Sequence, residues 1–146
     1  MILTSEKGVS AVEFALIAPL LFVLTFGSIE FALLLFDKAV ITNASREGAR
    51  AAIVYNAEVP DDYAPIREIV KSYANNYLVN LGVAGANFLS DADIVIIPET
   101  PELAGDITVT VNYSYDFLVL PNLAALVGGT FDGTVNLVGT TVMRKE

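Results

Sequence analysis

The stretch FALIAPLLFVLTFGSIEFALLLF, residues 14–36, decides the fold class of this 146-residue chain. Glu30 is the only charged residue in it. As a helix the stretch would extend about 34 Å at ~1.5 Å per residue, which is enough to cross a hydrocarbon core of roughly 30 Å. We therefore predict one membrane-spanning helix over residues 9–36.

The composition supports a membrane-anchored protein and excludes most enzyme chemistry. The chain is 54% hydrophobic and 17% charged, whereas a soluble domain has about 25% charged residues. Its net charge of −9 argues against binding to nucleic acid or anionic lipid. Because it has no His and no Cys, zinc sites, thiolate nucleophiles, His bases and haem ligands are excluded. We predict a non-enzyme without a cofactor.

The flanks of the apolar run indicate its orientation. Lys7 and the α-amine precede the run, and Asp37 follows it. This small asymmetry favours a cytoplasmic N-terminus, with a head of residues 37–146 on the other side of the membrane. The run is longer than the ~7–15 residues of a secretory h-region, so we do not expect signal peptidase to remove it.

Glu13 stands directly before the apolar run. A carboxylate at membrane depth costs roughly 2.5–3.5 kcal/mol on insertion scales, so it normally has a partner or a function. Cleavage after Gly8 would create a new α-amine on Val9, four residues from Glu13, and in a packed array that amine could neutralise the Glu13 of a neighbour. Alternatively, Glu13 extends to the interface or lies near Lys7 and has no function.

Several motifs occur together in the N-terminal third of the chain. A glycine, Gly8, precedes the run, the motif V-E-F-A-L occupies Val12 to Leu16, and Pro19 lies in the run. The motif G-x-x-E-F then occupies Gly27 to Phe31, and R-E-G-A-R occupies Arg46 to Arg50. This composite resembles the N-terminal signature of the TadE-like family, the pseudopilins of the tight-adherence (Tad/Flp) pilus system.

The resemblance implies processing and assembly. Residues 1–8 would be a leader removed by a prepilin peptidase, and Glu13 and Phe14 would act in assembly. The implied partners are other pilin-like subunits, the prepilin peptidase and the inner-membrane platform of pilus assembly.

Small residues follow the membrane segment at helical spacing. Ala44, Gly48 and Ala52 form a stripe on one helix face, and such stripes allow another backbone to approach closely. Arg46 and Arg50 are also four residues apart. We interpret these two arginines either as solvated or locally paired groups or as a subunit contact. Glu30 is a further candidate for a subunit contact.

The rest of the chain predicts an α+β head. The first helix should continue to a break at residues 56–60. A second helix should run from Asp61 or Asp62 to a C-cap at Gly82. Its apolar face should consist of Ile66, Ile69, Val70, Tyr73, Tyr77, Leu78 and Leu81. Residues 93–98, 106–117 and 133–143 predict a three-stranded antiparallel sheet, with Gly139 as a candidate bulge. Residues 120–127, LPNLAALV, predict a short exposed helix.

No constellation in the sequence indicates a metal or a catalytic site. Acid pairs such as Asp91 and Asp93 lack the spacing of a calcium loop. We therefore predict a pilin-like subunit in the bacterial inner membrane, or in the pilus when assembled. The alternative is an uncleaved, membrane-anchored periplasmic adaptor that scaffolds a secretion apparatus.

Overall fold

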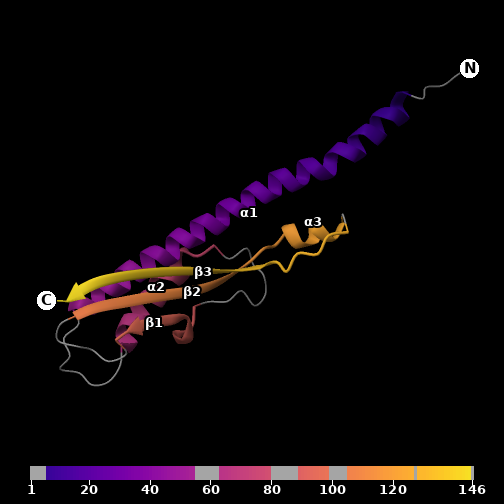
Figure 1. Ribbon diagram of the computed structural model, residues 1–146. Helices are drawn as coiled ribbons and strands as arrows, with labels where there is room; N and C mark the ends of the chain where they lie inside the picture. The colour runs from indigo at the N-terminus through magenta and orange to yellow at the C-terminus, as the bar shows by residue number, and fades with distance from the viewer. Residues whose placement is uncertain (1–5, 55–62, 80–88, 99–104, 127, 146) are drawn as a thin grey trace, which may run out of the picture. The chain divides into compact units, whose positions relative to one another are not determined.

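The computed structural model describes residues 6–54, 63–79, 89–98, 105–126 and 128–145. The chain forms two compact units, which are considered separately. The first combines Met1–Ala32 with Phe117–Gly133, and the second combines Leu33–Asp116 with Thr134–Glu146. Figure 1 labels the helices and strands along the chain.

Helix α1, Glu6–Val54, is a single α-helix of 49 residues with Pro19 inside it. The prediction that the apolar run continues without a break into the amphipathic segment is confirmed. The predicted break at residues 56–60 lies outside the described residues.

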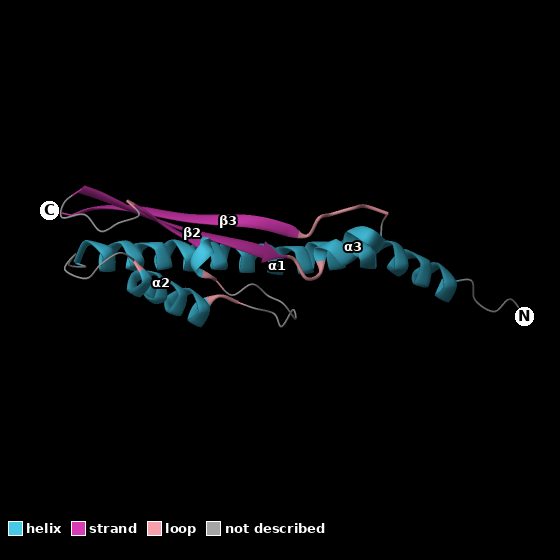
Figure 2. Cartoon of the chain, turned by 90° about the horizontal axis from the view of Figure 1, so that it is seen from below, coloured by secondary structure: helices cyan, strands magenta, loops and turns pink. Residues whose placement is uncertain are grey.

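The second unit contains a three-stranded antiparallel sheet in the order β1-β2-β3, as predicted. Its strands are β1 (Ile94–Ile97), β2 (Gly105–Asp116) and β3 (Thr134–Lys145), and β2 and β3 run side by side in both views (Figures 1 and 2). Successive residues of a strand point to opposite faces. On β2 the buried set is the predicted one: Ile107, Val109, Val111, Tyr113 and Tyr115.

Helix α2, Ala64–Tyr77, packs against α1 within this unit. Its buried residues are Ile66, Val70 and Ala74. The prediction that Ile69 and Tyr77 belong to the apolar core face is wrong, because their side chains are 39% and 56% exposed. The ring of Tyr77 lies tilted beside that of Tyr73, with centroids 5.0 Å apart. A Tyr with its hydroxyl in water gains from packing on another ring without entering the core.

The ends of α2 also differ from the prediction. The N-cap position is held by Tyr63, which makes no side-chain capping bond, and the helix ends at Tyr77 with Leu78 as C-cap. The proposed caps Asp61, Asp62 and Gly82 lie outside the described residues.

Gly139 does not form the predicted bulge, because the β2–β3 register is continuous through its partner Val111. A Cβ atom at Gly139 would lie 2.8 Å from the carbonyl oxygen of Ile41 and 3.0 Å from the amide nitrogen of Thr42. The glycine therefore allows the backbone of β3 to approach that of α1 closely. Near this contact, the Ser45 and Thr141 hydroxyls hydrogen-bond at 2.8 Å.

The first unit contains the short helix α3, Leu120–Leu126, where the sequence predicted one. The remaining element, the 3-10 turn η1 (Asp91–Asp93), precedes β1 in the second unit. A long apolar helix, a second helix and a three-stranded antiparallel sheet make this an α+β protein, as predicted.

Candidate functional site

The predicted processing and assembly residues lie on the first turns of α1. Gly8, Val9, Glu13 and Phe14 are all exposed, and Phe14 is 68% exposed. A Cβ atom at Gly8 would meet no atom within 4 Å. Nothing within the described part of the chain therefore covers this segment, and it is open to another molecule.

The apolar part of α1 has the length and composition of a membrane-crossing helix. Among the described residues, one such segment is found, Gly8–Val54. Its most apolar stretch of 18 residues has a mean hydropathy of 2.2, and 6% of that stretch is buried. The core helix of a soluble protein would bury most of such a window. The exposed window favours membrane anchoring.

Glu30 is the exception on this apolar helix, because its side chain is only 2% exposed. Its Oε1 accepts hydrogen bonds from the backbone N–H groups of Leu118 and Val119, both at 2.6 Å, and its Oε2 accepts one from Leu120 at 2.9 Å. The carboxylate thus satisfies N–H groups at the start of α3, which have no partner within the helix itself.

Sequence reasoning missed this contact between Glu30 and the start of α3. It considered Glu30 as a candidate subunit contact and did not identify its partners 88 to 90 residues away in the same chain. The sequence did contain a signal for this contact. An acid inside an apolar helix needs hydrogen-bond donors, and the N–H groups at the start of a later apolar helix have no partner within that helix.

The small-residue stripe of α1 lies in the second unit and is buried. Ala44 and Ala52 are 0% and 1% exposed. A Cβ atom at Gly48 would lie 2.4 Å from Cγ2 of Val70 on α2 and 3.3 Å from Cγ1 of Val109 on β2. Both α2 and the sheet therefore pack on this stripe within one chain.

The two arginines on the same segment face away from that core. Arg46 and Arg50 are exposed, and Nη1 of Arg46 donates to Oδ1 of Asn43 at 3.2 Å. Their exposure leaves them available to solvent or to another subunit.

Asp37, the first charged residue after the apolar run, is fully buried. Its Oδ1 accepts a hydrogen bond from the backbone N–H of Val79, just past α2, at 3.0 Å. Burial raises the pKa of Tyr113 on β2, and the nearby carboxylates of Asp37 and Asp116 raise it further. Asp37 thus ties the chain after α2 to α1.

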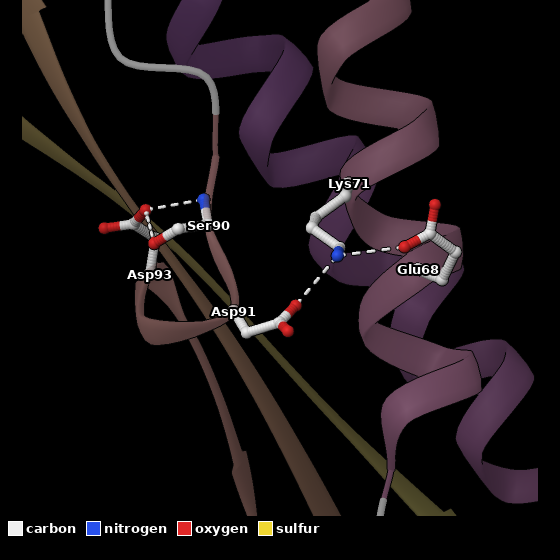
Figure 3. A network of polar contacts seen from close by, with 5 residues as sticks. All are labelled: Glu68, Lys71, Ser90, Asp91 and Asp93. Atoms are coloured by element: carbon white, nitrogen blue, oxygen red, sulfur yellow. Dashed lines mark hydrogen bonds and ion pairs between the residues drawn. The ribbon is translucent and has the colours of Figure 1, made fainter.

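The acids considered as metal ligands have other partners (Figure 3). Asp91 pairs with Lys71 at 2.9 Å, and Lys71 also pairs with Glu68 at 2.9 Å. Oδ2 of Asp93 accepts from the N–H and the hydroxyl of Ser90 at 2.8 and 2.7 Å, which closes the turn before β1. In the ranges that the structure describes, no group of three or more acids is placed to hold a metal ion.

The geometry of α1 agrees with the comparison to known families. Residues 8–50 match the family described as TadE-like protein. This segment, about the first third of the chain, is what the protein shares with the TadE-like family. Comparisons with curated proteins and with solved structures gave no match.

The TadE-like segment includes most of the features of α1 described above, although Ala52 of the small-residue stripe lies beyond it. It begins at Gly8 and contains the exposed Glu13, the buried Glu30, and Gly48 of the small-residue stripe. The N-terminal helix is thus TadE-like and pilin-like over residues 8–50, and the family match does not extend to the rest of the chain.

Proposed function

We propose that this protein is a pilin-like structural subunit, a minor pilin or pseudopilin, for assembly of a Tad/Flp-type pilus. The supporting observation is that the TadE-like segment starts at Gly8 and coincides with a long apolar helix whose surface is exposed. An exposed apolar helix suits lipid before assembly and other such helices afterwards.

The proposed maturation removes residues 1–8. A prepilin peptidase in the inner membrane cleaves after Gly8, which leaves Val9 as the new N-terminus. The exposure of Gly8 and Val9 supports this step, because a protease needs access to the scissile bond. The N-terminus is cytoplasmic, and the head of residues 37–146 lies on the periplasmic or outer side.

In the proposed assembly step, the α-amine of Val9 on one subunit neutralises Glu13 of its neighbour. Glu13 is exposed on α1 beside the exposed Phe14, so both can reach another helix. The pairing removes the cost of an isolated carboxylate among apolar helices. The partners are other pilin-like subunits and the inner-membrane assembly platform.

The decisive experiment is mass spectrometry of the N-terminus of the protein from cells that make the pilus. We expect a chain that begins at Val9. Gly8→Val should leave the full-length chain in the membrane, because the side chain crowds the scissile bond, whereas Ala11→Val adds similar bulk three residues away and should still be processed. Intact residues 1–8 in the wild-type protein would favour an uncleaved adaptor instead.

The assembly step has a separate test. Glu13→Leu should insert into the membrane at least as well as the wild type and should still be cleaved, because only the charge is lost. It should fail to co-purify with other pilins. Ile17→Leu, a conservative change on the exposed apolar surface one turn later, should co-purify normally. Normal co-purification of Glu13→Leu would show that Glu13 is merely an interfacial acid.

A further inference from the structure

The loop between β2 and β3 carries an unusually apolar segment. Residues 117–131, FLVLPNLAALVGGTF, contain no charged residue, although Asp116 and Asp132 stand at the two ends. Within the first unit this segment is held to α1 through Glu30. We propose that residues 117–131 form a membrane-embedded flap whose partner is the lipid hydrocarbon of the leaflet next to the head. This inference rests on the membrane anchoring in the proposed function.

The flap satisfies its backbone polar groups in the way that hydrocarbon requires. Three N–H groups at the start of α3 bind the Glu30 carboxylate. At the other end, the N–H groups of Gly128 and Gly129 bind the carbonyls of Ala125 and Ala124 at 3.2 and 2.8 Å. In lipid, each unsatisfied backbone group is costly, so these pairings lower the cost of placing the segment at the edge of the hydrocarbon.

One of the two polar side chains of the flap, Asn122, and the contacts that close the flap also have partners. Nδ2 of Asn122 donates to the carbonyl of Leu118 at 3.0 Å. The flap closes where the N–H of Phe117 binds the carbonyl of Gly133 at 2.7 Å. The rings of Phe117 and Phe131 meet edge to face, 5.3 Å apart.

The position of Glu30 sets the depth of the flap. Glu30 lies six residues before Phe36, the last residue of the apolar run, or about 9 Å along the helix axis at ~1.5 Å per residue. The side chain of Leu120 lies nearly one helical turn closer to the N-terminus of α1, because its Cδ2 would lie 3.4 Å from a Cβ atom at Gly27. Segments that lie in the interface enter the bilayer by about 5–10 Å. The Glu30 contact therefore lies within this range, and Leu120 lies about 4–5 Å deeper at ~1.5 Å per residue. The flap extends from the interface into the adjoining hydrocarbon wherever α1 spans the membrane.

The outer surface of the flap carries exposed apolar side chains beside two exposed polar residues, Asn122 and Thr130. Leu118 and Phe131 are 42% and 44% exposed, and Ala125 is exposed as well. On α1, the two sequence neighbours of Glu30, Ile29 and Phe31, are 51% and 58% exposed. Exposed apolar side chains on both segments, at a depth set by Glu30, favour lipid over a protein partner.

The test uses the absence of cysteine in the chain, which allows single-site labels. Ala125→Cys, Leu20→Cys and Glu68→Cys place one thiol each on the flap, on the apolar part of α1 and on the head, all at exposed positions. Each full-length protein is labelled with bimane and reconstituted at low density into phosphatidylcholine vesicles with or without brominated acyl chains. Bromine quenches only labels that touch the hydrocarbon.

We expect strong quenching at Leu20, at least half as much at Ala125, and almost none at Glu68. Quenching at Leu20 but not at Ala125 would overturn the flap and leave the membrane anchor intact. Absence of quenching at Leu20 would overturn the anchor and the flap together. A third outcome is that the label at Ala125 is shielded from bromine at every protein density and that copies form disulfide cross-links at this position. This outcome would show that a second copy covers the surface, and it would also overturn the proposal.

A second pair of variants tests the attachment to Glu30. In the Ala125→Cys protein, Glu30→Leu removes the acceptor of three N–H groups, so quenching at Ala125 should fall by at least half. Glu30→Gln keeps one acceptor oxygen and should give an intermediate value. Equal quenching in all three proteins would refute the role of Glu30 in holding the flap.

Discussion

Replacement of Gly48 by leucine tests how α1, α2 and the sheet pack together. Even a Cβ atom at this position would lie 2.4 Å from Cγ2 of Val70 and 3.3 Å from Cγ1 of Val109. Both valines are fully buried and each is stiff at χ1, so neither can rotate away cheaply. Leucine adds three further carbons beyond Cβ, and the helix must therefore separate from α2 or from β2.

The size of the effect follows from two opposing terms. Overpacking typically costs about 1–3 kcal/mol, and a leucine at this distance belongs at the upper end of that range. Leucine is the better helix former by about 0.8 kcal/mol. The net loss in the free energy of unfolding is therefore about 2 kcal/mol, which corresponds to a fall of roughly 8–16 °C in the melting temperature of a unit of about 100 residues.

The assay is thermal unfolding of the full chain in detergent micelles, followed by near-ultraviolet circular dichroism. The chain has no Trp, and its six Tyr all lie between residues 55 and 115, so the tyrosine signal reports on the second unit. Arg50→Leu is the matched control, because it places the same side chain at an exposed position of the same helix. The control should change the free energy of unfolding by less than about 0.5 kcal/mol. An equal or higher melting temperature for Gly48→Leu would refute the close packing.

Three further predictions concern the same unit. Gly139→Ala should lower its stability by about 1–3 kcal/mol, because the new Cβ atom would meet the backbone of Ile41 at 2.8 Å; the same melting assay checks this, and an unchanged midpoint contradicts it. Because burial raises the pKa of Tyr113, absorbance at 295 nm should show one tyrosine that ionises later than the others, and Tyr113→Phe should remove this late step. The raised pKa also means that the contribution of Tyr113 to stability is complete below its unfolded pKa of about 10 and is lost as the pH rises through the folded value. Lys71→Met should leave the melting temperature unchanged at both low and high salt, because its partners Glu68 and Asp91 are exposed; a salt-dependent fall would contradict this.

Local sequence patterns were sufficient wherever a structure depends on neighbouring residues. The period-2 alternation of residues 107–115 predicted the buried face of β2, because successive side chains of a strand alternate between faces. The unbroken apolar run predicted α1, and the LPNLAALV segment predicted α3. The spacing of Ala44, Gly48 and Ala52 indicated a close approach, since residues four apart share one helix face.

Long-range contacts decided the rest. The position of Glu30 in the apolar run indicates that it needs hydrogen-bond donors, but the sequence does not identify them as N–H groups some 90 residues away. Nor does it show that the N–H of Val79 binds Asp37. Gly139 was predicted to form a bulge. A glycine inside a strand commonly marks either a bulge or a close approach of another backbone, and only the tertiary position of Ile41 distinguishes the two. Likewise, the pattern of α2 counted Tyr77 as core, whereas the width of the contact with α1 leaves it in water. Periodicity determines which face of an element is apolar, but the partner that covers that face, and how much of it is covered, depends on residues distant in the chain.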